Sequence, residues 1–448
     1  MVIRLIKKIR SSLKDRPHLV KVIKNTWWLY FDKFSRLLIS LLVGIFIVRQ
    51  LGPMSFGEFS FAIAIVGLIS PIAAMGLGSI LTREFVKYPD KRGVFLGTSI
   101  GLRLISAGIS VAALFVFLYF TNIEFTILLM SMIFSLSLIF DSSNVLCQLF
   151  DSDLKSKFSI ITGQIVLMIT TVLKIILLIF GFSVIFFIIV SLFESLLSAI
   201  LLCTMFFRNY SGIKLKFDLE IGKKLVFSGL PFMLAGLGTV VYMHADQIVV
   251  GYMLPVAAVG FYAVAVKLSE FFYFIPAAIS TSVFPKLVNL DKDNFSKYKE
   301  KLQDFFDFLT LSSIILIIVS ILLSYPVIVF LYGIEYASVV PIFAIYMLSS
   351  IFIFFGIAAN NHLVIKDFGK LTLIRSVLGA VMNVILSIVF VYFFGLAGAA
   401  IATFICFGFT FWGSLFLFRE TKFLFFMFLE SFNFPRVFSK IVKKVLSK

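Results

Sequence analysis

Apolar stretches close to 20 residues long follow one another along almost the whole chain. Their apolar residues are continuous rather than alternating with polar ones, which is typical of membrane helices and not of barrel strands. Gly, Pro and clusters of charge separate the stretches. The predicted helices are 26–49, 57–82, 93–120, 125–150, 157–180, 184–207, 223–250, 257–285, 303–332, 338–365, 370–394 and 397–418. The pattern therefore predicts an all-α integral membrane protein with about twelve transmembrane helices.

Lysine and arginine gather in every second connection between these helices, and in the N-terminal tail. The opposite connections contain no Lys or Arg: 121–124, 181–183, 251–256, 333–337 and 395–396. Arg49, at the end of the first predicted helix, is the exception. By the positive-inside rule we expect both termini on the cytoplasmic side, which agrees with an even number of helices.

Both ends of the chain are basic, and neither has the pattern of a membrane-spanning helix. Residues 1–24 are mildly amphipathic and lack a continuous apolar core with a small-residue cleavage site, so they predict an interfacial segment rather than a signal peptide. The stretch 423–434 is too short to cross a bilayer and is followed by a basic tail. We therefore predict a second interfacial region at 421–448.

Composition agrees with lipid as the main solvent. The 448 residues are 60% hydrophobic and 14% charged, which leaves too few polar side chains to cover a water-facing surface. The net charge of +17 lies in loops, so nucleic acid is not an expected partner. Cys147, Cys203 and Cys406 lie in apolar stretches and are odd in number, which supports neither a disulfide framework nor a metal site.

Two parts of the sequence resemble each other at an offset of 203 residues. LGPMSFGEFSFAIAI (51–65) aligns with LPVAAVGFYAVAVKL (254–268), and Gly57 matches Gly260. Pro71 and Pro276 also fall at similar depths in the second and eighth predicted helices. With six helices of the same direction in each half, this predicts two parallel repeats. The predicted lobes are residues 25–218 and 219–420.

Several ionisable residues fall inside the predicted spans, where they are costly and usually face a cavity or a partner. Arg49, Arg103 and Lys174 have no obvious local partner and are the candidates for a water-filled, anion-attracting cavity. Anionic side chains lie at Asp32, Asp246 and Glu270, and His244 is of the residue type suited to a proton switch.

Plainer readings of these charges stay open. Asp32 with Arg36, and Lys267 with Glu270, have the spacing of pairs on one helix face. Lys174 is either a cavity residue or a partner of Glu194. Arg49 either binds substrate or serves as a helix cap or a headgroup ligand, and a lone histidine such as His244 is more often a packing residue. Polar residues such as Gln247, Asn360 and Asn361 either bond a hydroxyl-rich substrate or bond neighbouring helices.

The sequence contains no Walker loop, no HExxH and no CxxC pair, so no catalytic residue and no cofactor is predicted. The outward connections are short and leave no room for an outer catalytic domain. Without a nucleotide site, uphill transport is expected to use a proton or sodium gradient or the membrane potential.

Five segments together resemble the Wzx-type flippases of the polysaccharide transporter family, in the MOP exporter superfamily. They are NTWWLYFDK (25–33), VRQLGPMSFGEFSFA (48–62), SGLPFMLAGLGTVVYMHADQIVVGYML (228–254), VGFYAVAVKLSEFFYFIP (259–276) and GLAGAAIAT (395–403). The resemblance covers most of the chain and implies a MATE-like fold of two six-helix lobes around a central cavity. It implies a substrate as well, an oligosaccharide repeat unit linked through pyrophosphate to undecaprenyl lipid, which crosses to the outer leaflet of the bacterial inner membrane.

The resemblance also suggests roles and partners. Arg36, Arg103, Lys174 and Lys267 would attract the pyrophosphate, and Asp32, Asp246 or Glu270 would exchange a proton or sodium ion. Membrane lipids, a polysaccharide polymerase and chain-length proteins of the same pathway are the other expected partners. A multidrug or cation antiporter of the same superfamily, a polysaccharide polymerase or ligase, and a passive scramblase are the alternatives. An antiporter for cationic drugs would favour an acidic cavity, against the excess of intramembrane Arg and Lys.

Overall fold

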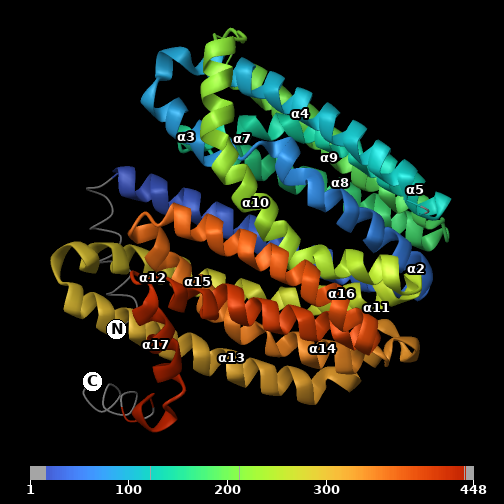
Figure 1. The fold of residues 1–448 in the computed structure, drawn as a ribbon. Helices are drawn as coiled ribbons and strands as arrows, with labels where there is room; N and C mark the ends of the chain where they lie inside the picture. Colours follow the sequence, from blue (N-terminus) through green and yellow to red (C-terminus); the bar gives the residue numbers. More distant parts are fainter. Residues whose placement is uncertain (1–16, 122, 211, 438, 440–448) are drawn as a thin grey trace, which may run out of the picture. The chain divides into compact units, whose positions relative to one another are not determined.

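The computed structural model describes residues 17–121, 123–210, 212–437 and 439, and every regular element among them is a helix (Figure 1). Most of the predicted interfacial segment 1–24, and most of the basic tail beyond 437, lie outside the described residues. The all-α class predicted from the apolar pattern is confirmed for the described part of the chain.

The chain forms two compact units. The first unit holds residues up to 50 together with 69–233, and the second unit holds 51–68 together with 234–448. The chain passes from one unit to the other inside two helices, α2 (Pro17–Ala74) and α10 (Leu219–Met253). The lobe boundary predicted between residues 218 and 219 stays a prediction.

The first unit contains, besides parts of α2 and α10, a bundle in which α8 packs along α9. Its elements are α3 (Gly78–Lys87), η1 (Pro89–Lys91), α4 (Arg92–Phe120), α5 (Phe125–Ser135), α6 (Ser137–Phe140), η2 (Asp141–Asn144), α7 (Val145–Ser152), α8 (Lys157–Ile179) and α9 (Val184–Asn209). Figure 1 shows α8 and α9 running side by side. Leu81, Phe85, Leu149 and Phe150 are fully buried in its core.

The second unit begins with the middle of α2 and continues from the second half of α10. Its further elements are α11 (Val256–Glu270), η3 (Phe271–Tyr273), α12 (Phe274–Asp293), α13 (Phe295–Tyr332), η4 (Ile334–Tyr336), α14 (Val339–Leu348), α15 (Ser350–Ile365), α16 (Gly369–Phe407), the π-helical turn η5 (Gly408–Trp412), η6 (Gly413–Leu417) and α17 (Lys422–Ser431). Phe306, Phe354, Phe355 and Phe428 are buried in a core that joins α13, α15 and α17.

Two predicted connections are not loops, which corrects the helix boundaries. The predicted helices 26–49 and 57–82 meet inside α2, where Gly52 has φ 67°. The predicted helices 370–394 and 397–418 meet inside α16, where Gly395 has φ 56°. Glycine reaches positive φ without a Cβ clash, so one residue redirects the chain at each place. The second predicted span is instead interrupted after Ala74, by Met75 and Gly76 at positive φ.

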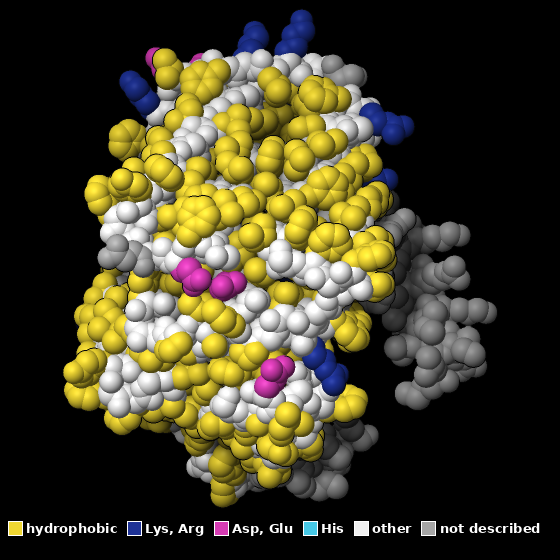
Figure 2. Space-filling model, turned by 90° about the vertical axis from the view of Figure 1, so that its right-hand side faces the viewer, with side chains coloured by type: hydrophobic (Ala, Val, Ile, Leu, Met, Phe, Trp, Pro, Cys, Tyr) yellow, Lys and Arg dark blue, Asp and Glu magenta, His cyan; other side chains and the backbone are white. Residues whose placement is uncertain are grey.

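Within the described residues, ten helical segments are long and apolar enough to cross a membrane. Two of them, 32–87 and 369–417, each contain two of the predicted spans. The predicted spans are therefore helical, apart from the interruption after Ala74 in the second one, and a multi-pass membrane protein is confirmed. Hydrophobic side chains cover most of the face shown in Figure 2 and charged ones are few, as expected for a surface solvated by lipid.

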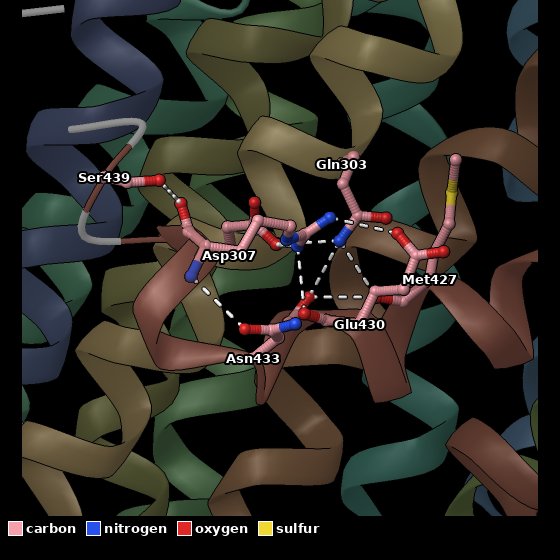
Figure 3. A network of polar contacts seen from close by, with 8 residues as sticks. Gln303, Asp307, Met427, Glu430, Asn433 and Ser439 are labelled. Carbon is pink, nitrogen blue, oxygen red and sulfur yellow. Dashed lines mark hydrogen bonds and ion pairs between the residues drawn. The ribbon is translucent and has the colours of Figure 1, made fainter. Parts of the chain in front are cut away.

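The short helix α17 is anchored to α13 by polar contacts as well as by the aromatic core (Figure 3). Arg436 Nη2 lies 2.6 Å from Asp307 Oδ1, and Arg436 Nη1 lies 3.0 Å from Glu430 Oε2. Gln303 Nε2 donates to Asp307 Oδ1 at 2.7 Å and to the Met427 carbonyl at 2.9 Å. With only 10 residues, α17 is too short to span a bilayer, as predicted.

Candidate functional site

Three of the predicted site residues line one cavity of the second unit, with a volume of about 230 Å³. We call it the Lys267 cavity, and its lining residues come from α2, α10 and α11. They are Phe59, Ser60, Ile63, Ala64, Gly67, Val240, His244, Gln247, Ala263, Val266, Lys267 and Glu270.

Helical spacing explains why these side chains share the cavity. Val240, His244 and Gln247 lie three or four residues apart on α10, and Ala263, Lys267 and Glu270 do so on α11, so each set lies on one helix face. The cavity therefore has one wall from each of these helices and a third from the part of α2 that belongs to the second unit.

Lys267 and Glu270 give the cavity its charge. The Lys267 side chain is exposed, and its Nζ lies 5.3 Å from the centroid of the Phe56 ring. Glu270 Oε1 is buried and has no hydrogen-bond partner among the described residues, while the charges of His244 and Lys267 both act on this carboxylate. Burying a hydrogen-bond acceptor without a donor costs free energy. A proton or a cation bound to this oxygen would remove that cost.

Asp246 is almost fully buried, with 1% of its surface exposed, and it does not line the cavity. Tyr262 Oη donates to Asp246 Oδ2 at 2.5 Å, and Thr403 Oγ1 donates to the same oxygen at 2.6 Å. The Gln247 backbone N–H donates to Oδ1 at 2.7 Å. Asp246 is close enough to His244 and to Glu270, two lining residues of the Lys267 cavity, for their charges to interact.

In the first unit, Asp32 and Arg36 form the pair that their spacing suggests. Arg36 Nε lies 3.0 Å from Asp32 Oδ1, and Gln164 Nε2 of α8 donates to the same oxygen at 2.8 Å. A Cβ atom at Gly163 would collide with the Arg36 guanidinium, so this glycine makes room for the cation against α8.

The other cations of the first unit have different surroundings. Lys174 Nζ lies 3.1 Å from Glu194 Oε2, so the reading as an ion pair between α8 and α9 holds. Arg103 of α4 is half-buried, and its Nε has no hydrogen-bond partner in the described part of the chain. The charge of Asp141 in η2 acts on it.

Arg49 lies at an apolar groove of about 640 Å³ between α2 and α8. The groove is lined by Ile39, Leu42, Val43, Phe46, Arg49, Gln50, Thr171, Ile175, Leu178 and Ile179. Gln50 Nε2 donates to the Leu178 carbonyl at 2.6 Å and so joins the two helices at the Arg49 end. No acidic side chain described in the structure pairs with Arg49.

Sequence reasoning overlooked Arg375, although a cation inside the predicted span 370–394 was a visible signal. Arg375 is buried, and its Nε donates to Ser414 Oγ at 2.8 Å while Nη2 donates to the Thr410 carbonyl at 2.8 Å. It lines a second cavity of the second unit, of about 510 Å³. Tyr262 and Thr403, the partners of Asp246, were also overlooked, because nothing local marks them. Among the described residues, no group of three His, Cys, Asp or Glu is placed to hold a metal ion.

Comparisons with known proteins agree with the helical architecture. The lipid II flippase MurJ in an inward closed conformation has a TM-score of 0.71 at 18% identity, covering 93% of this chain and 92% of that one. An inward-facing multidrug resistance MATE family transporter of the MOP superfamily has a TM-score of 0.70 at 15% identity, covering 90% and 95%. Both likenesses show the fold, and they confirm the MATE-like architecture expected from the sequence.

Sequence relatives point in the same direction. The probable flippase AglR of Haloferax volcanii is 30% identical over 168 residues, which are 36% of this chain and 35% of AglR. The match thus spans about a third of the length of that relative. The family model described as polysaccharide biosynthesis protein matches residues 22–290, more than half of the chain. This chain belongs to the polysaccharide biosynthesis protein family.

Proposed function

We propose that this protein is a flippase that moves an oligosaccharide repeat unit, linked by pyrophosphate to undecaprenyl lipid, from the cytoplasmic to the outer leaflet of the bacterial inner membrane. The family membership, the name of the AglR relative and the transporter fold support this class of activity. In this proposal the two termini are cytoplasmic, and a polymerase and chain-length proteins act on the product.

The observation that carries the proposal is the groove of the first unit with Arg49 in its wall. A lipid-linked pyrophosphate combines a long apolar chain with concentrated negative charge. The groove offers apolar side chains from α2 and α8 together with a guanidinium that has no acidic partner among the described residues. Arginine binds phosphate oxygens through parallel N–H donors, whereas it repels an organic cation.

Lys267 is the second residue that we assign to the pyrophosphate, because its side chain is exposed at a cavity of the second unit. Arg103 is a third candidate, since its Nε lacks a hydrogen-bond partner in the described structure. Arg36 and Lys174 are already paired with Asp32 and Glu194, so substrate binding there would require exchange of partners.

We assign ion coupling to Asp246 and Glu270. His244 interacts electrostatically with both carboxylates. A carboxylate in a membrane-buried position is stabilised by a proton or by a bound cation. In an alternating-access cycle, gain or loss of that ion would change the stability of the helix packing around α10 and drive the return step. Sodium and protons are both compatible with the oxygen donors at Asp246.

The test is flipping of a polyprenyl-pyrophosphate-linked oligosaccharide in vesicles that contain the purified protein. The wild type should move the lipid, Arg49→Ala should lower the rate about tenfold, equivalent to about 1.4 kcal/mol, and Arg49→Lys should retain part of it. Arg208→Ala, which removes an arginine at the end of α9 and outside the groove, is the matched control. Normal flipping by Arg49→Ala would remove the groove from the mechanism. Export of an organic cation such as ethidium without lipid flipping would favour the antiporter alternative.

In cells, deletion of the gene should leave complete undecaprenyl-linked repeat units on the cytoplasmic face. Single units that reach the outer face but are not lengthened would instead indicate a polymerase. This measurement needs no knowledge of whether the polysaccharide is O-antigen, capsule or another exopolysaccharide.

A further inference from the structure

The cavity of the second unit that contains Arg375 is unlike the Lys267 cavity in its chemistry. It lies among α10, α12, α15, α16 and η5, and we call it the amide cavity. Its polar lining residues are Thr239, Ser280, Thr281, Asn360, Asn361, Thr372, Arg375, Ser376 and Thr410. A volume of about 510 Å³ is in the range of sites for small-molecule ligands.

The amide cavity carries a positive charge. No Asp or Glu lines it, and Arg375 is its charged group. The guanidinium is fixed by the carbonyls of the π-helical turn η5 and by Ser414, so it cannot turn away. A ligand with a positive charge would be repelled at short range in a medium of low dielectric constant, so the cavity favours a neutral or anionic ligand.

Two threonine hydroxyl groups of the wall are committed as donors. Thr239 Oγ1 donates to the Ala235 carbonyl at 2.9 Å, and Thr281 Oγ1 donates to the Ala278 carbonyl at 2.8 Å. The Thr239 hydroxyl oxygen keeps acceptor capacity, so a ligand that bonds to it must supply the proton. Sugar hydroxyls do so, whereas an apolar drug or a bare phosphate dianion has no proton to donate.

Amide groups supply both kinds of hydrogen bond. Asn361 Nδ2 donates to Ser280 Oγ at 2.9 Å, and this bond holds the Asn361 side chain in place. Asn360, one residue earlier on α15, is exposed to the cavity and has no hydrogen-bond partner in the described part of the chain. Its amide can accept from one ligand hydroxyl and donate to another, which matches neighbouring hydroxyls on a pyranose ring.

Aromatic rings complete the wall. Tyr242 and Phe411 meet edge to face with centroids 5.9 Å apart, and both line the cavity. Gly356 lets the Phe411 ring approach α15, because a Cβ atom there would collide with it. Ring faces beside hydroxyl and amide groups suit a molecule with polar edges and apolar C–H faces.

We propose that the amide cavity binds a pyranose unit, as a saccharide subsite separate from the groove and cations assigned to the lipid pyrophosphate. The proposal rests on the proposed function for its biological role, since the oligosaccharide is the part of the cargo that needs such a site. Binding of a sugar at this place does not itself require flipping.

The experiment uses the purified full-length protein in detergent and measures binding of soluble probes by saturation-transfer NMR. The sugar probes are glucose, galactose, rhamnose and N-acetylglucosamine, and tetraethylammonium is the cation probe. At least one sugar should bind, and Asn360→Leu and Thr281→Val should each weaken it at least fivefold. Asn209→Leu makes the same change at an exposed asparagine of α9 and should leave binding unaltered.

Absence of binding by all four sugars, or equal binding by wild type, Asn360→Leu and Thr281→Val, would overturn the subsite. Binding of tetraethylammonium that Asn360→Leu abolishes would overturn the ligand class. The vesicle assay separates the two proposals. If the wild type binds sugar in an Asn360-dependent way but never flips lipid, the subsite stands and the proposed function is wrong. If the wild type flips lipid without such binding, the proposed function stands and the subsite is wrong.

Discussion

Gly57 of α2 and Gly260 of α11 lie against each other backbone to backbone. A Cβ atom on either glycine would lie 3.1 Å from the backbone nitrogen of the other. Each Cβ would also collide with a carbonyl, that of Val256 or that of Pro53. These glycines are the residues that match at the offset of 203 in the sequence, so equivalent positions of the two predicted repeats meet in one helix crossing within the second unit.

Gly57→Ala and Gly260→Ala should each destabilise the protein by about 1–3 kcal/mol, because a methyl group has to push two backbones apart. The midpoint of thermal unfolding in detergent should fall for both. Gly44→Ala is the control, since a Cβ atom there would have nothing within 4 Å and alanine favours the helix. Equal midpoints for all three variants would show that the crossing tolerates a wider separation.

Lys174→Met should destabilise the protein by about 2 kcal/mol because it leaves the Glu194 carboxylate unpaired inside the bundle. The double variant Lys174→Met with Glu194→Met should recover most of that loss, since no lone charge remains. Both effects are measured by thermal unfolding, and flipping by the double variant should stay near that of the wild type. A large loss of flipping by a stable double variant would restore Lys174 to the substrate site.

Asp246→Asn should uncouple transport from its driving ion while the fold stays intact. Asparagine has nearly the same shape and its carbonyl still accepts from Tyr262 and Thr403; its NH2 group cannot accept from the Gln247 N–H, and it cannot exchange an ion. Lipid flipping measured under an imposed proton or sodium gradient should lose its dependence on that gradient. Asp218→Asn makes the same change at the beginning of α10, where the side chain caps the helix, and it should leave stability and gradient dependence nearly unaltered, because asparagine caps a helix about as well as aspartate. An Asp246→Asn protein that still responds to either gradient would exclude this carboxylate as the coupling group.

Tyr210→Phe should lower the free energy of unfolding by about 1.5 kcal/mol, because Tyr210 Oη donates to Asp153 Oδ2 at 2.6 Å. Burial and then the neighbouring Asp153 carboxylate raise the pKa of Tyr210 above its ordinary value. The unfolded chain ionises near pH 10, the ordinary pKa of tyrosine, while the folded protein keeps this proton. The stability gained from Tyr210 is therefore complete below pH 10 and declines as the pH rises toward the folded pKa.

The measurement is the difference in unfolding midpoint between wild type and Tyr210→Phe at several pH values. It should stay constant from about pH 7 to pH 9 and shrink above about pH 10. Tyr392→Phe, at a side chain that is 75% exposed, should show no difference across the series. A difference that grows with pH would contradict the assigned donor role of Tyr210.

The sequence predicted the helices because membrane spans are encoded by local composition, and it predicted the pair of Asp32 with Arg36 because helix spacing is local. It did not predict that one glycine, Gly52 or Gly395, would redirect the chain between two helices, since an apolar pattern does not distinguish a loop from a turn at one glycine. The sequence also did not predict hydrogen bonds between residues far apart along the chain. Thr403 bonds Asp246 from 157 residues away, and no pattern near either residue indicates that contact.

Within α10, His244 and Gln247 line the Lys267 cavity, and Asp246 between them is bonded to Tyr262 and Thr403. All three side chains are attached to about one turn of a helix, which behaves as a rigid body at this scale. A rotation or shift of this turn that accommodates a ligand at His244 must displace the Asp246 carboxylate from hydroxyl donors 2.5 and 2.6 Å away. In the proposed function, this one turn of α10 joins the side chains that face the cargo to the carboxylate assigned to ion coupling, and no flexible linker lies between them.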